Sequence, residues 1–159
     1  GMSDADVFGE CYTRNYKLVY RVCYTYMQNR FDAEDCTEDV FVKVLTGKYT
    51  FRDADHEAAW LTVVAMNLCR DKLKARRRHA EVSLDDVGDT ADEDPGIDET
   101  LREVMRLPLK YKDVVYMYYY MGYPTDRIAA ELHKPASTVR NHLREAREML
   151  RVRLAGANA

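Results

Sequence analysis

The stretch Pro135-Ala-Ser-Thr-Val-Arg-Asn-His-Leu-Arg-Glu-Ala-Arg-Glu-Met-Leu-Arg151 carries two helical stripes, one apolar and one basic. Apolar residues recur at the i, i+4, i+7 and i+11 spacing of one α-helical face. Arginines repeat this spacing one position later, about 100° further around the helix axis. The stripes are Val139, Leu143, Ala146 and Leu150, and Arg140, Arg144, Arg147 and Arg151. One face can therefore pack against a core while the adjoining face reaches a polyanion such as DNA.

A shorter apolar helix comes directly before this stretch. Ile128, Ala129 and Leu132 share one helical face, and His133-Lys134-Pro135 then interrupts the helix before the basic helix starts. This order of helix, tight turn and helix predicts a helix-turn-helix. The alternative is a plain helical hairpin whose arginines form a solvated face.

The composition is that of an ordinary globular protein, with 159 residues, 47% hydrophobic and 32% charged. The net charge of -3 hides a strong segregation along the chain. Basic residues dominate from Asn67 to His79, and acidic residues without any Lys or Arg follow through residues 81–98. We predict that residues 81–98 form a flexible acidic linker. A pI near 5.8 does not exclude nucleic acid, because local basic clusters create the phosphate-binding surface.

Several classes of function are disfavoured by the sequence. The apolar runs are too short to span a bilayer, and no signal segment opens the chain, so we expect a cytoplasmic protein without membrane insertion. The four cysteines lack CxxC or Cys/His spacing, which predicts packed, reduced thiols and no metal site, with a disulfide or zinc site as the alternative. We find no catalytic constellation, and we expect neither an enzyme nor a cofactor.

Residues 1–80 are predicted to form a module of three helices. The first covers residues 8–27, and the second starts at Asp32-Ala-Glu-Asp35, where the helix dipole favours acids, and ends at Gly47. The third begins near Glu57. The predicted core residues are Val7, Cys11, Leu18, Val22, Tyr26, Val40, Phe41, Val44, Leu45, Trp60, Leu61, Val64, Ala65 and Leu68.

Residues 99–159 are predicted to form a second helical module. The run from Val114 to Met121 is β-prone in composition, but Leu107-Pro108 gives a helix start and Gly122 a helix stop. We expect this helix to lie under the helix-turn-helix. Its predicted buried residues are Val114, Val115, Met117 and Tyr118. The predicted fold is all-α, with two small helical domains joined by the acidic linker.

Two sets of motifs resemble conserved regions of bacterial sigma factors, and most closely the extracytoplasmic-function (ECF) group of the sigma-70 family. Motifs similar to the second region are Asp32-Ala-Glu-Asp-Cys-Thr-Glu-Asp-Val-Phe41, Ala59-Trp-Leu61, Ala65-Met-Asn-Leu-Cys-Arg-Asp71 and Arg76-Arg-Arg78. Motifs similar to the fourth region are Leu107-Pro-Leu-Lys-Tyr-Lys112, Tyr118-Tyr-Tyr-Met-Gly-Tyr123, Ile128-Ala129 and Thr138-Val139. The resemblance implies a sigma factor that binds core RNA polymerase, recognises promoter DNA and helps to melt it.

The resemblance implies that the acidic second helix docks on the clamp helices of the largest polymerase subunit. Carboxylates suit this role because they can pair with Arg or Lys of a partner. The matching residues are Asp32, Glu34, Asp35, Glu38 and Asp39. Helix-dipole capping plus a solvated face would explain the first-turn acids equally well.

The third helix is similar to the element that opens the minus-ten region and holds the displaced strand. Asn67 matches the family position that touches a flipped base, and residues 49–56 match the family's base-selecting loop. The cations expected to hold phosphates are Arg70, Lys72, Lys74, Arg76, Arg77 and Arg78. Trp60 is expected in the core rather than stacked on a base.

The helix-turn-helix is similar to the family's reader of the minus-thirty-five element. Residues expected near base edges are Ser137, Thr138, Arg140, Asn141 and Arg144, while Arg147 and Arg151 are better placed for the DNA backbone. Three residues depart from the family pattern: His133 replaces the usual turn glycine, Pro135 the usual N-cap serine, and Glu145 a common arginine. We expect Glu145 to place a negative charge near the DNA side.

Two other functions are compatible with the residues. A stand-alone helix-turn-helix regulator would bind duplex DNA without polymerase, and a sigma-like adaptor would bind only protein. The resemblance also implies an anti-sigma factor as a partner, which would hold the chain inactive.

Overall fold

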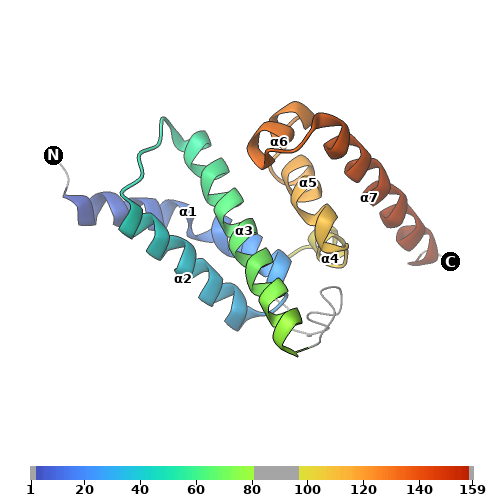
Figure 1. Ribbon diagram of the computed structural model, residues 1–159, viewed down its shortest axis with the longest axis horizontal. Coiled ribbons are helices and arrows are strands. Elements are labelled where there is room, and N and C mark those ends of the chain that lie inside the picture. The colour runs from blue at the N-terminus through green and yellow to red at the C-terminus, as the bar shows by residue number, and fades with distance from the viewer. Residues whose placement is uncertain (1–2, 81–96, 158–159) are drawn as a thin grey trace. The chain divides into compact units, whose positions relative to one another are not determined.

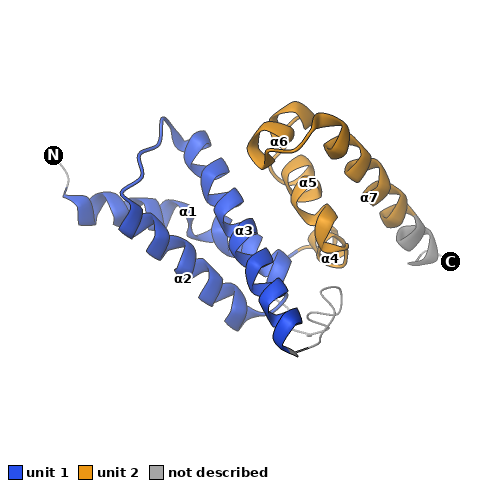
Figure 2. Ribbon diagram, viewed as in Figure 1, with its two compact units in different colours: residues 1–97 blue, residues 98–159 orange. Residues whose placement is uncertain are grey.

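The computed structural model describes residues 3–80 and 97–157, and within these ranges every regular element is a helix (Figure 1). The predicted all-α fold is confirmed. The helices are α1 (Asp4–Met27), α2 (Arg30–Gly47), α3 (Ala54–Ala80), α4 (Glu99–Met105), α5 (Leu109–Tyr119), α6 (Thr125–Leu132) and α7 (Ala136–Ala157). The chain divides into two compact units, residues 1–97 and residues 98–159 (Figure 2). Most of the predicted acidic linker, residues 81–96, lies outside the described residues.

Unit 1 is a bundle of α1, α2 and α3. Helix α1 begins at the Ser3 cap, whose hydroxyl accepts a hydrogen bond from the backbone N–H of Asp6, and it ends where Gln28 adopts a left-handed conformation with φ 64°. Asn29 follows at once and caps α2 by accepting from the N–H of Asp32. The break between these helices is therefore short, and α2 folds back beside α1.

The core of unit 1 lies between the three helices and contains most of the predicted residues. Val22, Tyr26, Val40, Phe41, Leu61 and Ala65 are almost completely buried. Two core predictions are wrong, because Val7 is 51% exposed and Leu45 is 54% exposed. Val7 lies near the start of α1, and Leu45 lies in the last turn of α2. At both places the helical spacing of apolar residues continues, but these side chains do not enter the core.

Helix α3 begins at Ala54, earlier than the predicted start near Glu57. Asp53 explains the difference, because its Oδ1 accepts a hydrogen bond of 2.8 Å from the N–H of His56 in the first turn. Gly47 is the last residue of α2, as predicted, and Lys48 then turns left-handed with φ 52°. A Cβ at Gly47 would overlap the Tyr49 ring as it is placed here, so a larger residue at this position would displace that ring.

Unit 2 is built from α4 to α7. Pro108 directly precedes α5, and Gly122, with φ 69°, lies shortly after the helix ends, as the sequence predicts. Helix α7 packs against both α5 and α6. Val114, Val115 and Met117 of α5 are buried, and Tyr118 is half-buried. Val139, Leu143 and Ala146 of α7 are also buried, with Leu150 half-buried, so the predicted apolar stripe is confirmed.

Two further expectations concern the chain as a whole. None of the described helices combines the length and apolar character needed to cross a membrane. All four cysteines are buried free thiols, as predicted.

Candidate nucleic-acid and polymerase interfaces

The turn before α7 is closed by backbone geometry rather than by a glycine. His133 has φ 54°, in the left-handed region that favours glycine. The N–H groups of His133 and Lys134 donate to carbonyls of Ala130 and Ala129, which completes the end of α6. The next helix starts at Ala136, and the carbonyl of Pro135 accepts from the N–H of Val139. Helices α6 and α7 thus form the predicted helix-turn-helix.

The basic stripe of α7 lies on its exposed face. Arg140, Arg144, Arg147 and Arg151 are all exposed, as are Ser137 and Asn141, while Thr138 is half-buried. Arg147 is held by α5: its Nε donates to the Tyr119 hydroxyl at 3.2 Å, and its guanidinium lies 5.3 Å from the centre of the Tyr118 ring. Arg151 pairs with Glu148 at 2.7 Å. Arg140 and Arg144 lie closer to the start of the helix, where base contacts are expected.

Glu145 contacts α5. Its Oε2 accepts a hydrogen bond of 2.6 Å from the Tyr111 hydroxyl, and this bond lowers the pKa of Glu145 below the ordinary glutamate value. Tyr111 also meets the His142 ring edge-on at 5.5 Å. The carboxylate therefore stays charged and is held by a tyrosine of the supporting helix, while its nearness to the DNA side stays a prediction.

The basic end of α3 presents part of its charge to solvent. Asn67, Lys74, Arg77 and Arg78 are exposed. Arg70 is half-buried and lies beside Asn67, with 3.5 Å between Arg70 Nη1 and Asn67 Oδ1. Several cations and one amide thus lie close together along one helix, as a nucleic-acid strand would require.

Two of the predicted DNA-binding cations pair with two of the predicted polymerase-binding acids. Lys72 Nζ lies 2.6 Å from Asp39 Oδ2, and the Arg76 guanidinium makes two contacts of 2.8 Å with the Asp32 carboxylate. The hydrogen bonds from Arg76 lower the pKa of Asp32 below its ordinary value. These pairs join α2 to α3 across 33 and 44 residues of sequence.

The remaining acids of α2 lie on its exposed face. Glu34 and Asp35 are exposed, and Glu38 accepts a hydrogen bond of 3.0 Å from the Tyr12 hydroxyl. The sequence analysis missed the apolar residues beside them. Phe31 is 78% exposed, and Val42 and Leu45 are also exposed. Phe31, Val42 and Leu45 are spaced at i, i+11 and i+14, which places them on the same helical face as Glu34 and Glu38. This spacing was the signal in the sequence that could have revealed the exposed apolar residues.

The loop between α2 and α3 is held by aromatic contacts. Tyr49 and Phe51 lie against Trp60, with ring centres 4.4 and 5.5 Å apart. The N–H of Arg52 donates to Nδ1 of His56 at 3.1 Å. Trp60 is half-buried beneath this loop, so its packing partners include the loop as well as the helical core.

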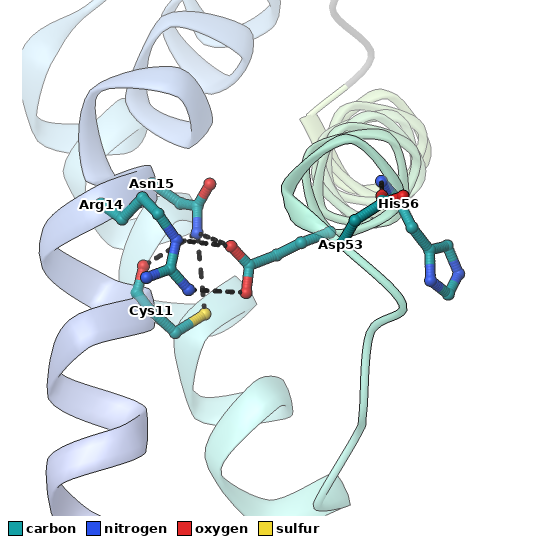
Figure 3. A network of polar contacts seen from close by, with 6 residues as sticks. Cys11, Arg14, Asn15, Asp53 and His56 are labelled. Carbon is teal, nitrogen blue, oxygen red and sulfur yellow. Dashed lines mark hydrogen bonds and ion pairs between the residues drawn. The ribbon is translucent and has the colours of Figure 1, made fainter.

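A polar network fixes the start of α3 to α1 (Figure 3). Arg14 donates two hydrogen bonds, of 2.9 and 3.0 Å, to Glu57, and Asn15 donates another of 2.6 Å. Asn15 also donates to the carbonyl of Cys11. Burial alone would raise the pKa of Glu57, but the donors from Arg14 and Asn15 outweigh it and lower that pKa. The buried carboxylate therefore stays charged and holds the helix that follows the loop.

Unit 1 has an exposed basic helix end, and unit 2 has an exposed basic recognition helix. Together these features define a DNA-binding transcription protein of the helix-turn-helix class. Residues 11–79 match sigma-70 region 2, and residues 97–150 match sigma-70 region 4. The chain belongs to the ECF group of the sigma-70 family. It directs RNA polymerase to promoters for transcription initiation, and its partners are core RNA polymerase and promoter DNA. Sigma factors are not enzymes.

Relatives match across most of the chain. The ECF RNA polymerase sigma factor SigM of Mycobacterium tuberculosis is 26% identical over 156 residues, which cover 96% of this chain and 79% of the relative. The ECF RNA polymerase sigma factor SigW of Bacillus subtilis is 24% identical over 169 residues, with 95% and 90% covered. A shorter match joins this chain to the ECF sigma factor BldN of Streptomyces coelicolor, with 34% identity over 88 residues, covering 54% of this chain and 33% of the relative.

Proposed function

We propose that the two units divide promoter recognition between them. Residues 1–80 bind core polymerase and the minus-ten element, residues 81–98 act as a tether, and residues 99–159 read the minus-thirty-five element. The observation that carries this proposal is the exposure of cations at two places, each on a helix with a buried apolar face. These are Lys74, Arg77 and Arg78 on α3, and Arg140 and Arg144 on α7.

The polymerase is bound by the exposed face of α2. Glu34 and Asp35 offer carboxylates to cations of the partner, and Phe31 adds apolar area that would be buried on binding. Protein interfaces typically have aromatic side chains at their centre and polar residues at their rim. This face therefore supports an interface of mixed apolar and ionic character. Glu34, Asp35 and Glu38 carry the proposed contacts, while Asp32 and Asp39 of the predicted acidic set pair with Arg76 and Lys72 of α3.

The minus-ten strand is held along α3. The Asn67 amide is exposed and can both donate to and accept from the edge of an unstacked base. The loop held against Trp60 lies directly before this helix in the chain, which supports a role for residues 49–56 in base selection.

The minus-thirty-five element is read by α7 in the major groove. Arg140 and Arg144 can each make bidentate contacts with guanine, and Ser137, Thr138 and Asn141 lie on the same early turns. Arg147 and Arg151 are assigned to phosphates. The bond between Arg147 and Tyr119 supports a positioning contact rather than base reading.

Transcription from purified components tests this proposal. The protein is added to core RNA polymerase and a supercoiled genomic library, and new transcript starts are mapped. We expect specific starts that core polymerase alone does not produce. Binding of polymerase without any new start would favour an adaptor, and tight duplex binding without any polymerase association would favour a stand-alone regulator.

We also propose that an anti-sigma factor holds the protein inactive in the cytoplasm. Such inhibitors are usual in the ECF group. Co-purification from uninduced cells should recover a stoichiometric protein that is not a polymerase subunit. Recovery of polymerase subunits alone would contradict the proposal.

A further inference from the structure

The predicted strand-binding residues of α3 lie on two opposite helical faces. At about 100° per residue, Arg70, Lys74, Arg77 and Arg78 lie within about 80° of Asn67 around the helix axis. Lys72 and Arg76 lie about 140° and 180° from Asn67 by the same geometry. One straight strand therefore cannot follow all of these side chains at once.

The second face is turned toward α2. Lys72 meets Asp39 at 2.6 Å, and Arg76 meets Asp32 at 2.8 Å through both guanidinium nitrogens. The Lys72 and Arg76 side chains are 37% and 46% exposed, so pairing with a carboxylate rather than burial is what engages them. A carboxylate at this distance cancels most of the field that a cation would exert on a more distant phosphate.

The Arg76 pair also has a mechanical consequence. Leu73 is almost completely buried, whereas residues 74–79 are exposed or half-buried. Arg76 thus lies beyond the apolar packing of α3, and its two contacts with Asp32 tie this end of the helix to the start of α2. Arg77 and Arg78 come directly after this anchor.

We infer that the phosphates of the displaced strand follow a track formed by Arg70, Lys74, Arg77 and Arg78 beside Asn67, while Lys72 and Arg76 are anchors rather than DNA contacts. Asp39 and Asp32 hold these anchors, and the Arg76 pair ties the end of α3 to α2. This inference rests on the proposed role of residues 1–80 in holding the strand, and it assigns the cations within that site.

Salt dependence separates the two faces. The full chain is titrated with fluorescein-labelled oligothymidine at several salt concentrations, and the slope of log affinity against log salt is measured by anisotropy. For a single strand, the loss of one phosphate contact reduces the magnitude of this slope by about 0.7. We expect this loss for Lys74→Ala, Arg77→Ala and Arg78→Ala, and an unchanged slope for Lys72→Ala and Arg76→Ala.

The last two variants are matched controls, because each removes one cation from the same helix. The double variant Lys72→Met with Asp39→Asn also keeps the net charge, and it too should retain the slope of the unmodified chain. Circular dichroism of every variant establishes that it is folded. An equal loss of slope for Lys72→Ala and Lys74→Ala would overturn the inference, as would an unchanged slope for all α3 variants or an absence of binding at low salt.

The anchors are tested by hydrogen exchange. Asp32→Asn should speed exchange of the backbone amides of residues 74–79, Asp32→Glu should restore most of the protection, and Glu34→Gln should leave it unchanged. Exchange that is the same in all three variants would contradict the anchoring role. Neither experiment uses polymerase, so failure of the transcription assay with intact phosphate binding would count against the proposed function and not against the track.

Discussion

Lys134 donates a hydrogen bond of 2.8 Å to the Oδ2 of Asp113, whose carboxylate is fully buried in α5. Lys134 belongs to the turn of the helix-turn-helix, directly after the left-handed His133. The ion pair therefore ties the turn to the helix beneath it. Because a buried charge is costly without its partner, this pair is expected to matter for the stability of unit 2.

Replacement of Lys134 should destabilise unit 2. Lys134→Met removes the ammonium that pairs with the buried Asp113 carboxylate at 2.8 Å, and we expect a loss of about 2 to 4 kcal/mol in the free energy of unfolding. Lys110→Met, which removes an exposed lysine from the same unit, should cost under about 1 kcal/mol. Chemical denaturation followed by circular dichroism measures both. Equal losses for the two variants would show that the pair contributes little.

A glycine at position 133 should stabilise the protein. A side chain in the left-handed region costs about 1 to 2 kcal/mol, which exceeds the entropy that glycine loses on folding. We expect His133→Gly to raise the melting temperature by a few degrees and His133→Val to lower it, because a branched Cβ is least tolerated there. Thermal unfolding followed by circular dichroism tests the order Gly, His, Val. A lower melting temperature for the glycine variant would mean that the His133 side chain makes a stabilising contact.

The stability of unit 1 should depend on the charge of Glu57. Its pKa is lowered in the folded state, so its contribution is present above the ordinary value of 4.5 and is lost as the pH falls through the lowered pKa. Glu57→Gln should therefore cost about 1 to 3 kcal/mol near neutral pH, and the difference from the unmodified chain should disappear in acid. Trp60, the only tryptophan, reports this unfolding by fluorescence. Glu10→Gln, an exposed change on α1, is the control and should show no such pH dependence.

The local features of this fold are predictable from the sequence, whereas the contacts between helices are not. The stripe of Val139, Leu143 and Ala146 appears in the spacing of the residues, because a helix repeats its own geometry. The pairing of Arg76 with Asp32 depends on the register between two helices, which is set by the packing of the core. Exposure of Val7 and Leu45 has the same origin, because periodicity alone does not say where a neighbouring helix ends.

Removal of the Asn67 amide should impair promoter opening more than polymerase binding. Asn67→Ala loses hydrogen bonds to an unstacked base, each good base contact being worth about 1 to 3 kcal/mol, so we expect opening to fall by about tenfold. Permanganate reactivity of unpaired thymines measures opening, and gel filtration with core polymerase measures association. Asn141→Ala on α7 is the matched control, because it should weaken closed-complex binding to the duplex without a specific loss of opening.

Charge reversal on α2 should weaken polymerase binding and leave the DNA affinity of unit 2 unchanged. Glu34 and Asp35 are exposed and lie beside Phe31, so Lys at both positions would repel a cationic partner across the proposed interface. We expect the affinity for core polymerase to fall by about tenfold or more. Surface plasmon resonance with immobilised core polymerase measures this loss.

The matched control for this reversal is Asp4→Lys with Glu10→Lys, which makes the same change in net charge on exposed positions of α1. Polymerase affinity should be nearly unchanged in this control, since α1 is not part of the proposed interface. If both double variants lose affinity equally, general electrostatic attraction rather than the α2 face accounts for binding. If the α2 reversal instead abolishes opening while polymerase affinity is intact, the polymerase and strand faces of unit 1 have been assigned the wrong way round.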